Sequence, residues 1–452
     1  MIALNNLSGK TIAVFGLGKS GMATLEALRG SGARILVGDD NADSRAKAES
    51  LGFATTDLTK ADWTKIDSLI LSPGIPHTHP EPHPVAALAK ANKVEIVGDV
   101  EYLFRQVTEP TYVGITGTNG KSTTTALIAH ILTTANRKNE VGGNLGTPVL
   151  SFTPLGKDGT YVIEMSSFQC ELTPSAAFDV AVWLNITPDH IDRHGDIEGY
   201  VKAKKMLLRD ANKKQVLVIG VDDEFSAKVA DEVERGGHWR VIRISSQRML
   251  ERGISGIDGV LYNDGNDLFS IKKATTLPGA HNSQNAAAAL AASNALGIDI
   301  GKIDKGIHSY PGLPHRQQLI RTIDGIRFIN DSKATNADAT SKALACYDAI
   351  YWIVGGKAKD GGLNGLEAFM PRIKHSFLIG YAADDFHKWL NGKAPSSISK
   401  TIDVAVRDAA KMAAAAGNKE AVVLLSPACA SYDQFNNYEH RGETFAALVN
   451  AL

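Results

Sequence analysis

The chain has 452 residues, which is too long for one ordinary hydrophobic core and, at about 150 residues per domain, predicts about three domains. Its 48 Lys and Arg residues balance its 49 Asp and Glu residues, which excludes broad electrostatic binding to nucleic acid or to an anionic membrane. The three widely spaced cysteines, Cys170, Cys346 and Cys429, exclude a disulfide framework and a cysteine-based metal site. Together with the lack of a signal-peptide pattern, they predict a cytoplasmic protein.

Short β-branched runs alternate with longer helical stretches, which predicts βαβ units and an α/β fold with mostly parallel sheets. Most of these runs are continuously apolar, as in strands that are covered on both faces. The predicted strands are Thr11–Phe15, Arg34–Gly38, Tyr112–Thr116, Tyr161–Glu164, Val180–Asn185, Gln215–Gly220, Ile350–Gly355, Ser376–Gly380 and Ala421–Ser426. The alanine-rich tract that begins at Asn285 is shorter than the roughly 20 residues of a membrane span, so we expect a packed helix.

Two polar, proline-containing stretches mark the predicted domain boundaries. The stretch from Gln106 to Pro110 precedes a new strand, and the stretch from Tyr310 to His315 interrupts the chain after a predicted helix. We therefore expect domains at residues 1–107, 108–312 and 313–452.

A first glycine-rich turn, residues 16–21, follows the first predicted strand and opens a helix. Asp39 and Asp40 end the next strand, where a ribose-binding acid lies in dinucleotide-binding folds. Taken alone, this pattern predicts a nicotinamide-dependent oxidoreductase, but any diphosphate, including that of UDP, binds a helix N-terminus in the same way. A turn that serves only helix packing is the simpler alternative. The segment Leu71–Ile75 follows another strand and adds backbone donors to the same crevice.

A second glycine-rich turn runs from the strand at residues 112–116 into a helix that begins near Lys121. Gly117 and Gly120 let the backbone approach phosphate oxygens, Lys121 adds a positive charge, and Ser122 offers a ligand to Mg²⁺. The spacing departs from G-x-x-x-x-G-K-S because residue 115 is Ile. The flanking strand and helix nevertheless favour a nucleotide-binding loop over an incidental glycine turn.

Carboxylates and histidines follow the next two strands. Glu164 ends one strand at the sheet edge where ligands bind, and a hard carboxylate suits Mg²⁺. Asp189, His190, Asp192 and His194 follow the other strand. Zinc is an alternative for these histidines, but Mg²⁺ fits ATP chemistry better, and a hydrogen-bonded loop role is as good an interpretation of either histidine alone.

These motifs together resemble the Mur ligases of peptidoglycan synthesis, and the resemblance covers essentially the whole chain. It runs through Gly117–Thr123, Gly143–Gly146, Glu164–Gln169, Asn185–His190, Tyr200–Lys204, His281–Asn285, Leu313–Arg316 and Asn330–Thr335. Leu425–Phe435 and Glu439–Gly442 resemble the D-glutamate-adding member. The D-N-P-R segment of the diaminopimelate- or lysine-adding ligase is absent from the sequence.

The resemblance implies a monomeric ligase that uses ATP and Mg²⁺ to add D-glutamate to UDP-N-acetylmuramoyl-L-alanine, giving ADP and phosphate. It implies a Rossmann-like UDP-binding domain, a central P-loop ATPase domain and a Rossmann-like C-terminal domain. The L-alanyl carboxylate would become an acyl phosphate, which the amine of D-glutamate then attacks. The alternatives are another Mur ligase specificity, the nicotinamide-dependent oxidoreductase, and an ATP-switched scaffold that forms no bond.

The resemblance also implies roles for individual residues, of which we expect Lys121, Glu164, His190, Lys204 and Arg316 to be catalytic. The implied contacts to ATP are Gly117, Thr118, Asn119, Gly120, Lys121, Ser122, Thr123, Asn144, Asn282, Asn285, Arg316 and Asp331. Two Mg²⁺ sites are implied, one held by Ser122 and Glu164 and the other by His190 and a carbamylated Lys204. Without the resemblance, Lys204 reads as a solvated lysine beside Lys202 and Lys205, and the asparagines read equally well as cap or surface residues.

The two substrates have their own implied contacts. Those to the UDP precursor are Gly18, Lys19, Ser20, Asp39, Asn41, Ser72, Gly74 and Asn144. Those to D-glutamate are Lys333, Thr335, Lys359, Ser431 and Tyr438, and the two lysines would neutralise its two carboxylates. The family often has Phe where this chain has Tyr438, which adds a hydroxyl group.

Overall fold

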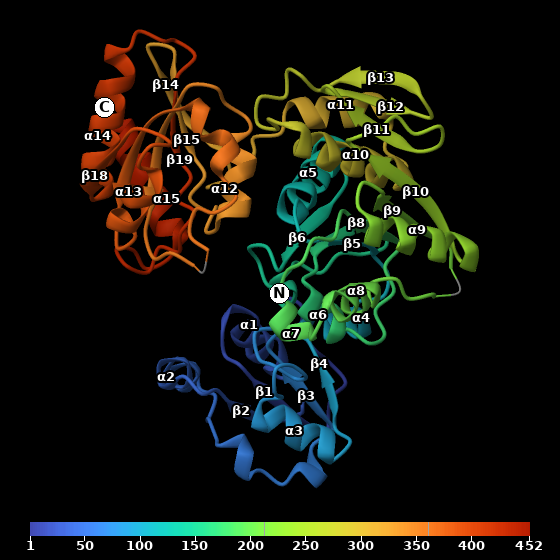
Figure 1. The fold of residues 1–452 in the computed structure, drawn as a ribbon. Coiled ribbons are helices and arrows are strands. Elements are labelled where there is room, and N and C mark those ends of the chain that lie inside the picture. Colours follow the sequence, from blue (N-terminus) through green and yellow to red (C-terminus); the bar gives the residue numbers. More distant parts are fainter. Residues whose placement is uncertain (212, 360) are drawn as a thin grey trace. The chain divides into compact units, whose positions relative to one another are not determined.

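The computed structural model describes residues 1–211, 213–359 and 361–452 (Figure 1). Within these ranges the strands form three sheets, and the chain divides into two compact units. The first unit comprises Met1–Lys273 and Asn282–Ser309, and the second comprises Ala274–His281 and Tyr310–Leu452. The predicted α/β class is confirmed, because helices alternate with mostly parallel strands. Each sheet lies inside one predicted domain range, while the boundaries at residues 107 and 312 stay a prediction.

The first sheet has the strand order β2-β1-β3-β4, and its strands are all parallel. Its strands are β1 (Thr11–Phe15), β2 (Arg34–Gly38), β3 (Ser68–Leu71) and β4 (Glu95–Val97). Its helices are α1 (Lys19–Leu28), α2 (Ala42–Ser50), α3 (Pro84–Ala91) and α4 (Asp99–Gln106), with 3₁₀ turns at Leu58–Lys60 and Trp63–Lys65. Because parallel strands share their carboxyl-terminal edge, the turns that follow β1, β2 and β3 come together there.

The second sheet has the order β13-β12-β11-β10-β9-β8-β5-β7-β6 and is parallel except at the β12 and β13 edge. Its strands are β5 (Thr111–Thr116), β6 (Asn139–Gly143), β7 (Thr160–Glu164), β8 (Val180–Trp183), β9 (Gln215–Gly220), β10 (Trp239–Ser245), β11 (Ile254–Ile257), β12 (Val260–Asn263) and β13 (Asn266–Ser270). Its helices are α5 (Lys121–Thr134), α6 (Ser167–Glu171), α7 (Ile191–His194), α8 (Ile197–Lys205), α9 (Glu224–Gly236), α10 (Ala280–Ala295) and α11 (Ile300–His308), with a 3₁₀ turn at Val149–Ser151. The alanine-rich tract is the buried helix α10, as expected.

The third sheet has the order β14-β15-β19-β16-β17-β18 and is parallel except for β14. Its strands are β14 (Gln318–Ile323), β15 (Ile326–Asn330), β16 (Ile350–Gly355), β17 (Ile373–Ile379), β18 (Ser396–Lys400) and β19 (Val422–Leu425). Its helices are α12 (Ala337–Leu344), α13 (Ala383–Leu390), α14 (Ile402–Ala415) and α15 (Tyr438–Asn450), with a 3₁₀ stretch at Glu367–Arg372. Alternate residues of β16 belong to different hydrophobic clusters, Trp352 to one and Ile353 to the other, so both faces of this sheet are covered.

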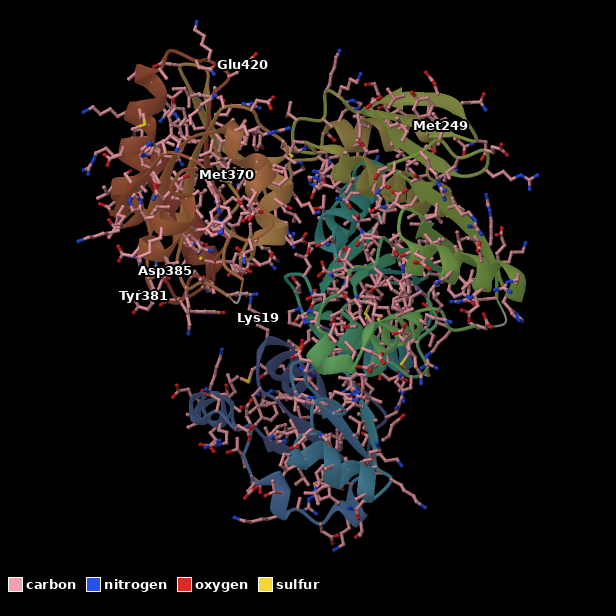
Figure 2. The ribbon with its side chains drawn as sticks, viewed as in Figure 1. Lys19, Met249, Met370, Tyr381, Asp385 and Glu420 are labelled. Carbon is pink, nitrogen blue, oxygen red and sulfur yellow. The ribbon has the colours of Figure 1, made fainter. Side chains whose placement is uncertain are left out.

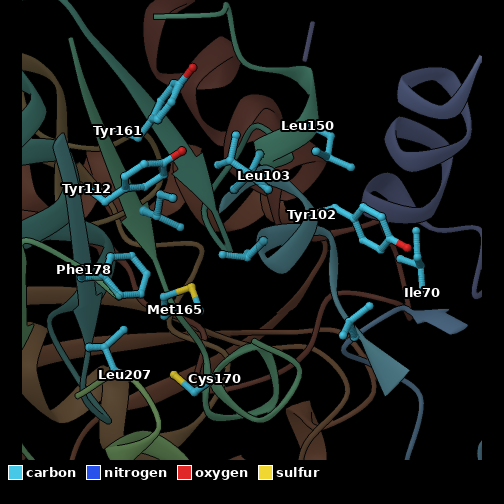
Figure 3. Packing of buried hydrophobic residues seen from close by; sticks show 14 of the residues in the cluster. Ile70, Tyr102, Leu103, Tyr112, Leu150, Tyr161, Met165, Cys170, Phe178 and Leu207 are labelled. Carbon is cyan, nitrogen blue, oxygen red and sulfur yellow. The ribbon is translucent and has the colours of Figure 1, made fainter. Parts of the chain in front are cut away.

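The first and second sheets share one hydrophobic cluster inside the first unit. Ile70 of β3 and Leu103 of α4 belong to the same cluster as Leu150, Tyr112 and Tyr161 of the second-sheet region (Figure 3). The turns that follow β1 and β3 are therefore carried by the same buried core as the nucleotide loop. None of the helices in the described ranges combines the length and hydropathy that a bilayer crossing requires.

Candidate active site

The predicted nucleotide loop joins β5 to α5, which begins at Lys121 as expected. Gly117 and Gly120 have φ angles of 145° and 85°, which disfavour side chains. A Cβ atom on Gly120 would lie only 2.3 Å from Oδ1 of Asn285, so the loop also needs glycine for space. The Nζ atom of Lys121 donates to the carbonyl oxygens of Gly117 and Thr118, each at 2.8 Å. The loop thus holds its own cation at the helix N-terminus, where phosphates bind.

The loop is fixed from outside by asparagine and glutamine side chains. Asn185, just after β8, accepts a hydrogen bond from the backbone N–H of Asn119 at 2.9 Å, and its amide donates to Gln284 of α10 at 3.0 Å. Asn285 donates to Asn282 at 2.9 Å, and both are buried one turn apart on α10, as expected. The predicted contacts do not include Asn185 or Gln284, although Asn185 ends a predicted strand and Gln284 lies between two predicted contacts.

Glu164 ends β7 and lies in register between β5 and β6. Its side chain is buried, and Oε1 accepts a hydrogen bond from the amide of Asn144 at 2.7 Å. Oε2 is also buried and has no hydrogen-bond partner among the described residues. Because a buried anionic oxygen is costly unless a cation or donor meets it, this atom fits a Mg²⁺ ligand. Ser122, the second residue of α5, is buried as well.

Lys204 of α8 is only 1% exposed, so the simple interpretation of it as a solvated lysine is wrong. Its Nζ atom donates to the carbonyl oxygen of Gly117 at 3.0 Å and to Oγ1 of Thr116 at 3.3 Å. Burial, helped by the charge of Lys121, lowers the pKa of Lys204 to about 7. A large share of the amine is therefore neutral near pH 7, and the neutral amine is the form that adds carbon dioxide to give a carbamate.

His190 lies just before α7 with a left-handed φ of 51°, and its ring Nε2 is 3.4 Å from a carboxylate oxygen of Asp189. Burial lowers the pKa of His190, which favours the neutral imidazole that binds metals. His194 has other partners, because Nε2 contacts Oγ of Ser167 at 2.9 Å and Nδ1 lies 3.7 Å from Glu171. The two imidazoles are thus engaged separately, which argues against a shared zinc ion. Within the described ranges no group of three or more His, Cys, Asp or Glu side chains is arranged to hold a metal ion.

The first glycine-rich turn packs closely against the first residues of α1. A Cβ atom on Gly21 would lie 2.0 Å from the carbonyl oxygen of Gly16, so close packing requires glycine there. The backbone N–H of Leu17 donates to the carboxylate of Asp39, which also accepts from the N–H of Asn41 at 2.7 Å. Asp39 therefore holds the turn in shape.

The other candidate contacts to the UDP precursor surround this turn. Gly18 precedes α1, and Lys19 begins it with an exposed side chain (Figure 2). Burial raises the pKa of Asp99, and a hydrogen bond from Ser20 opposes that rise. Ser72 donates its backbone N–H to the carbonyl oxygen of Phe15 at 2.9 Å, which fixes the turn after β3 beside β1.

The second unit contains all the residues implied for D-glutamate and, of those implied for the nucleotide, Arg316 and Asp331. Asp331 is buried and accepts hydrogen bonds from Oγ of Ser426 at 2.8 Å and the N–H of Gln317 at 3.1 Å. Burial raises the pKa of Asp331 to about 7, and the charge of Arg316 opposes that rise. Nζ of Lys333 lies 5.1 Å from the ring centroid of Tyr438.

Arg441 connects the segment around Ser332 to the segment around Cys429. It is not among the site residues that the sequence predicts. Its guanidinium is buried and donates to the carbonyl oxygens of Ser332 at 2.8 Å and Cys429 at 3.1 Å. The motif Glu439–Gly442, which contains Arg441, was the signal for it. Ser431, two residues after Cys429, is buried. Thr335 is half-buried and Lys359 is exposed.

Two family models match parts of the chain. Residues 115–293 match the Mur ligase middle domain, a range that contains the nucleotide loop, Glu164, His190 and Lys204. Residues 6–74 match the NADPH-binding domain of acetohydroxy acid isomeroreductase, in agreement with the dinucleotide-type turn after β1.

Solved structures share the fold of the whole chain. The UDP-N-acetylmuramate-alanine ligase MurC of Thermotoga maritima has a TM-score of 0.60 and 16% identity, covering 98% of this chain and 99% of that one. The MurF ligase of Thermotoga maritima, solved in complex with ADP, has a TM-score of 0.56 and 18% identity, covering 100% of this chain and 98% of that one.

A curated relative matches from end to end. The UDP-N-acetylmuramoylalanine–D-glutamate ligase of Rhodospirillum rubrum is 49% identical over 461 residues, which cover 100% of this chain and 97% of the relative. An alignment of that length includes the glycine turns of both sheets and the whole second unit, whereas the NADPH-binding match ends at residue 74. The chain therefore belongs to the Mur ligases, in the family of UDP-N-acetylmuramoylalanine–D-glutamate ligases.

Proposed function

We propose that the chain joins D-glutamate to the L-alanyl carboxylate of UDP-N-acetylmuramoyl-L-alanine and converts ATP to ADP and phosphate. The observation that carries the proposal is the convergence of Lys121 and Lys204 on the carbonyl oxygen of Gly117, beside the buried, unpaired oxygen of Glu164. The cation of Lys121 and a hard carboxylate at a helix N-terminus suit a triphosphate with Mg²⁺. The name of the 49% identical relative supplies the substrates.

A carboxylate reacts poorly with an amine, because its charge repels nucleophiles and oxide leaves badly. Transfer of the terminal phosphoryl group of ATP to the L-alanyl carboxylate removes both obstacles, and the amine of D-glutamate then displaces phosphate. Two anions must meet in the first step, so the protein has to spread negative charge. Lys121 and the N–H groups at the start of α5 do this for the nucleotide, and Arg316 is the other cation assigned to this role.

The finer assignments concern the metal ions. Ser122 and Glu164 would hold one Mg²⁺, and His190 with carbamylated Lys204 would hold another. When bound, these ions neutralise phosphate charge and orient the reacting oxygens. Carbamylation turns the buried amine of Lys204 into an anionic oxygen ligand, and the low pKa of Lys204 supports it.

Each of the two substrates is assigned to one of the two units. The turns after β1 and β3 bind the diphosphate and sugar of the UDP precursor. Lys333 and Lys359 of the second unit receive the two carboxylates of D-glutamate. We further propose that the chain is a monomer and that it is cytoplasmic. The three free cysteines support the cytoplasmic location, since unpaired thiols suit a reducing compartment.

The test is product analysis with the purified chain. Incubation with ATP, Mg²⁺, D-glutamate and UDP-N-acetylmuramoyl-L-alanine should give ADP and a product heavier by one glutamyl residue, and omission of any component should abolish it. ADP without a new bond would instead indicate the ATP-switched scaffold. Product with another amino acid would indicate another Mur specificity, and tight binding of NADH without turnover would favour the oxidoreductase.

The carbamate has its own test. Depletion of carbon dioxide, or the substitution Lys204→Ala, should reduce ligase activity, and ¹³C-bicarbonate should give a carbamate carbon signal in wild-type protein alone. Lys202→Ala is the matched control, because Lys202 is exposed on the same helix. An unchanged rate after both treatments would reject the second metal site as assigned.

A further inference from the structure

Arg193 of α7 contacts two regions that must stay at a fixed distance from each other for the proposed function. Its Nη1 atom donates to the carbonyl oxygen of Gly74 at 3.2 Å. Its guanidinium carbon lies 4.4 Å from the ring centroid of Phe168 in α6. Gly74 belongs to the turn after β3, a candidate contact to the UDP precursor, and α6 begins three residues after Glu164. One side chain therefore touches the precursor turn and the helix beside a candidate metal ligand.

Phe168 extends this contact to His190. The ring of Phe168 meets that of His190 edge-on, with centroids 5.1 Å apart, and stacks on His194 at 5.3 Å. Arg193 and His190 thus contact the same aromatic ring. A shift of the guanidinium would change what supports the imidazole of His190.

A second contact joins the same two segments. The two oxygens of the Glu171 carboxylate lie 3.9 Å from Nε2 of His77 and 3.7 Å from Nδ1 of His194. His77 follows Gly74 on the turn after β3, whereas Glu171 ends α6. The precursor turn is therefore attached to α6 and α7 at two points, and both points involve the residues around Phe168.

The Nε atom of Arg193 is buried and has no hydrogen-bond partner among the described residues. Other arginines, such as Arg105 and Arg243, are paired with carboxylates. The contacts that Arg193 does make, a backbone carbonyl and an aromatic face, hold its planar group in a fixed orientation.

We propose that Arg193 is a positioning residue for the ligase reaction, which fixes the Gly74 carbonyl and, through Phe168, the ring of His190. This inference rests on the proposed function, since Gly74 and His190 take their roles from it. Small displacements of a reacting group cost large factors in rate, so one residue that sets the distance between the precursor and the metal ligands affects both binding and turnover. The loop after β5, which carries most of the proposed contacts to ATP, takes part in neither contact.

The test is a steady-state comparison of wild type with Arg193→Ala. Loss of a charge-assisted hydrogen bond predicts a KM for the UDP precursor raised by about tenfold or more, together with a lower kcat. The KM for ATP should stay close to wild type. Arg193→Lys keeps a cation that can donate to Gly74 but lacks the planar face, so it should restore most of the precursor KM and only part of kcat. Phe168→Leu should lower kcat with a smaller change in that KM.

Arg240→Ala is the matched control, because Arg240 is exposed on β10. Titration of the UDP precursor without ATP measures the binding part separately, and thermal unfolding checks the fold of each variant. If wild type forms no product, the proposed function fails. The positioning role is overturned if wild type is active and Arg193→Ala either matches it or raises all KM values equally. Should Arg193→Ala not fold, the KM for the precursor, the KM for ATP and kcat are compared between wild type and Arg193→Lys instead.

Discussion

Lys121 is the residue whose loss should be most costly for catalysis and least costly for the fold. It lies half-buried at the first position of α5 and donates to two carbonyl oxygens of its own loop. The substitution Lys121→Ala removes the cation that meets the triphosphate, so we expect ATP turnover to fall by about a hundredfold or more, as when a transition-state donor is removed.

Phosphate release measures this effect, and circular dichroism during heating measures the fold. Lys138→Ala, an exposed lysine beyond the same helix, should retain wild-type turnover. Rapid ATP turnover by a folded Lys121→Ala variant would contradict the assignment of the loop.

Asp331 should make the second unit less stable as pH rises. Burial raises the pKa of its carboxyl from 3.8 to about 7, so the folded unit keeps a proton that the unfolded chain loses between these values. The favourable contribution of Asp331 is complete below about pH 3.8 and is lost as pH rises through about 7. Asp331→Asn keeps an acceptor for Ser426 and cannot ionise, so it should remove this dependence.

Calorimetric unfolding at several pH values between about 5 and 8 checks the prediction, since this window spans the folded-state titration. Wild type should lose more of its melting temperature across the window than Asp331→Asn. Asp338→Asn, an exposed position on α12, should follow wild type. Parallel curves for wild type and Asp331→Asn would show that the carboxyl does not titrate as described.

The sequence identifies some site residues from local pattern, but it does not show which distant residues surround them in the fold. Lys121 follows two glycines in a loop motif, and Glu164 ends an apolar strand, so both can be found from local pattern. Lys204 cannot, because its hydrogen-bond partner Thr116 lies 88 positions earlier and only the fold brings them together. Arg193 was missed for the same reason, since Gly74 lies 119 positions before it.

At the scale of elements, apolar runs locate the buried strands. Each predicted strand is present, although β17 begins at Ile373 rather than Ser376 and β8 ends at Trp183 rather than Asn185. Among the strands outside the predicted set, β4, β6, β13, β14 and β18 lie at sheet edges. Strands β12 and β13 form a half-exposed hairpin, whose Asp264-Gly265 turn was the signal that would have revealed it. An edge strand is covered on fewer sides, so it lacks the continuous apolar run of a central one.

The packing of α10 against the nucleotide loop gives a prediction at this scale. In Gly120→Ala, the new Cβ would lie 2.3 Å from Oδ1 of Asn285 and the residue would keep a φ of 85°, so loop and helix must separate. The left-handed backbone conformation alone costs alanine about 1–2 kcal/mol, and the steric clash adds to this cost. ATP binding should therefore weaken by about tenfold or more.

Titration of ATP into the folded variant measures the loss of affinity. Gly237→Ala is the matched control, because Gly237 has a φ of 72° at the end of α9 but nothing within 4 Å of the new Cβ. It should lower the melting temperature slightly and leave ATP affinity intact. Equal affinity in both variants would show that the contact between Asn285 and the loop does not matter.

At the scale of the whole molecule, the two units have separate cores. Leu217 of β9 belongs to the cluster shared by the first and second sheets, whereas Leu424 of β19 belongs to a cluster of the third sheet. The buried cluster that includes Ile70 and Tyr161 joins the first two sheets in one compact unit. Separate cores allow separate unfolding, because cooperativity depends on shared buried contacts.

We therefore expect two calorimetric transitions, and core substitutions should separate them. Leu217→Ala and Leu424→Ala each remove a fully buried side chain from a central strand, which costs about 2–5 kcal/mol. Leu217→Ala should lower the transition that shifts upward with ATP and Mg²⁺, since the nucleotide loop lies in that unit. Leu424→Ala should lower the other one. If both variants move a single transition by the same amount, the two units unfold as one cooperative body, and the buried core of each depends on the other.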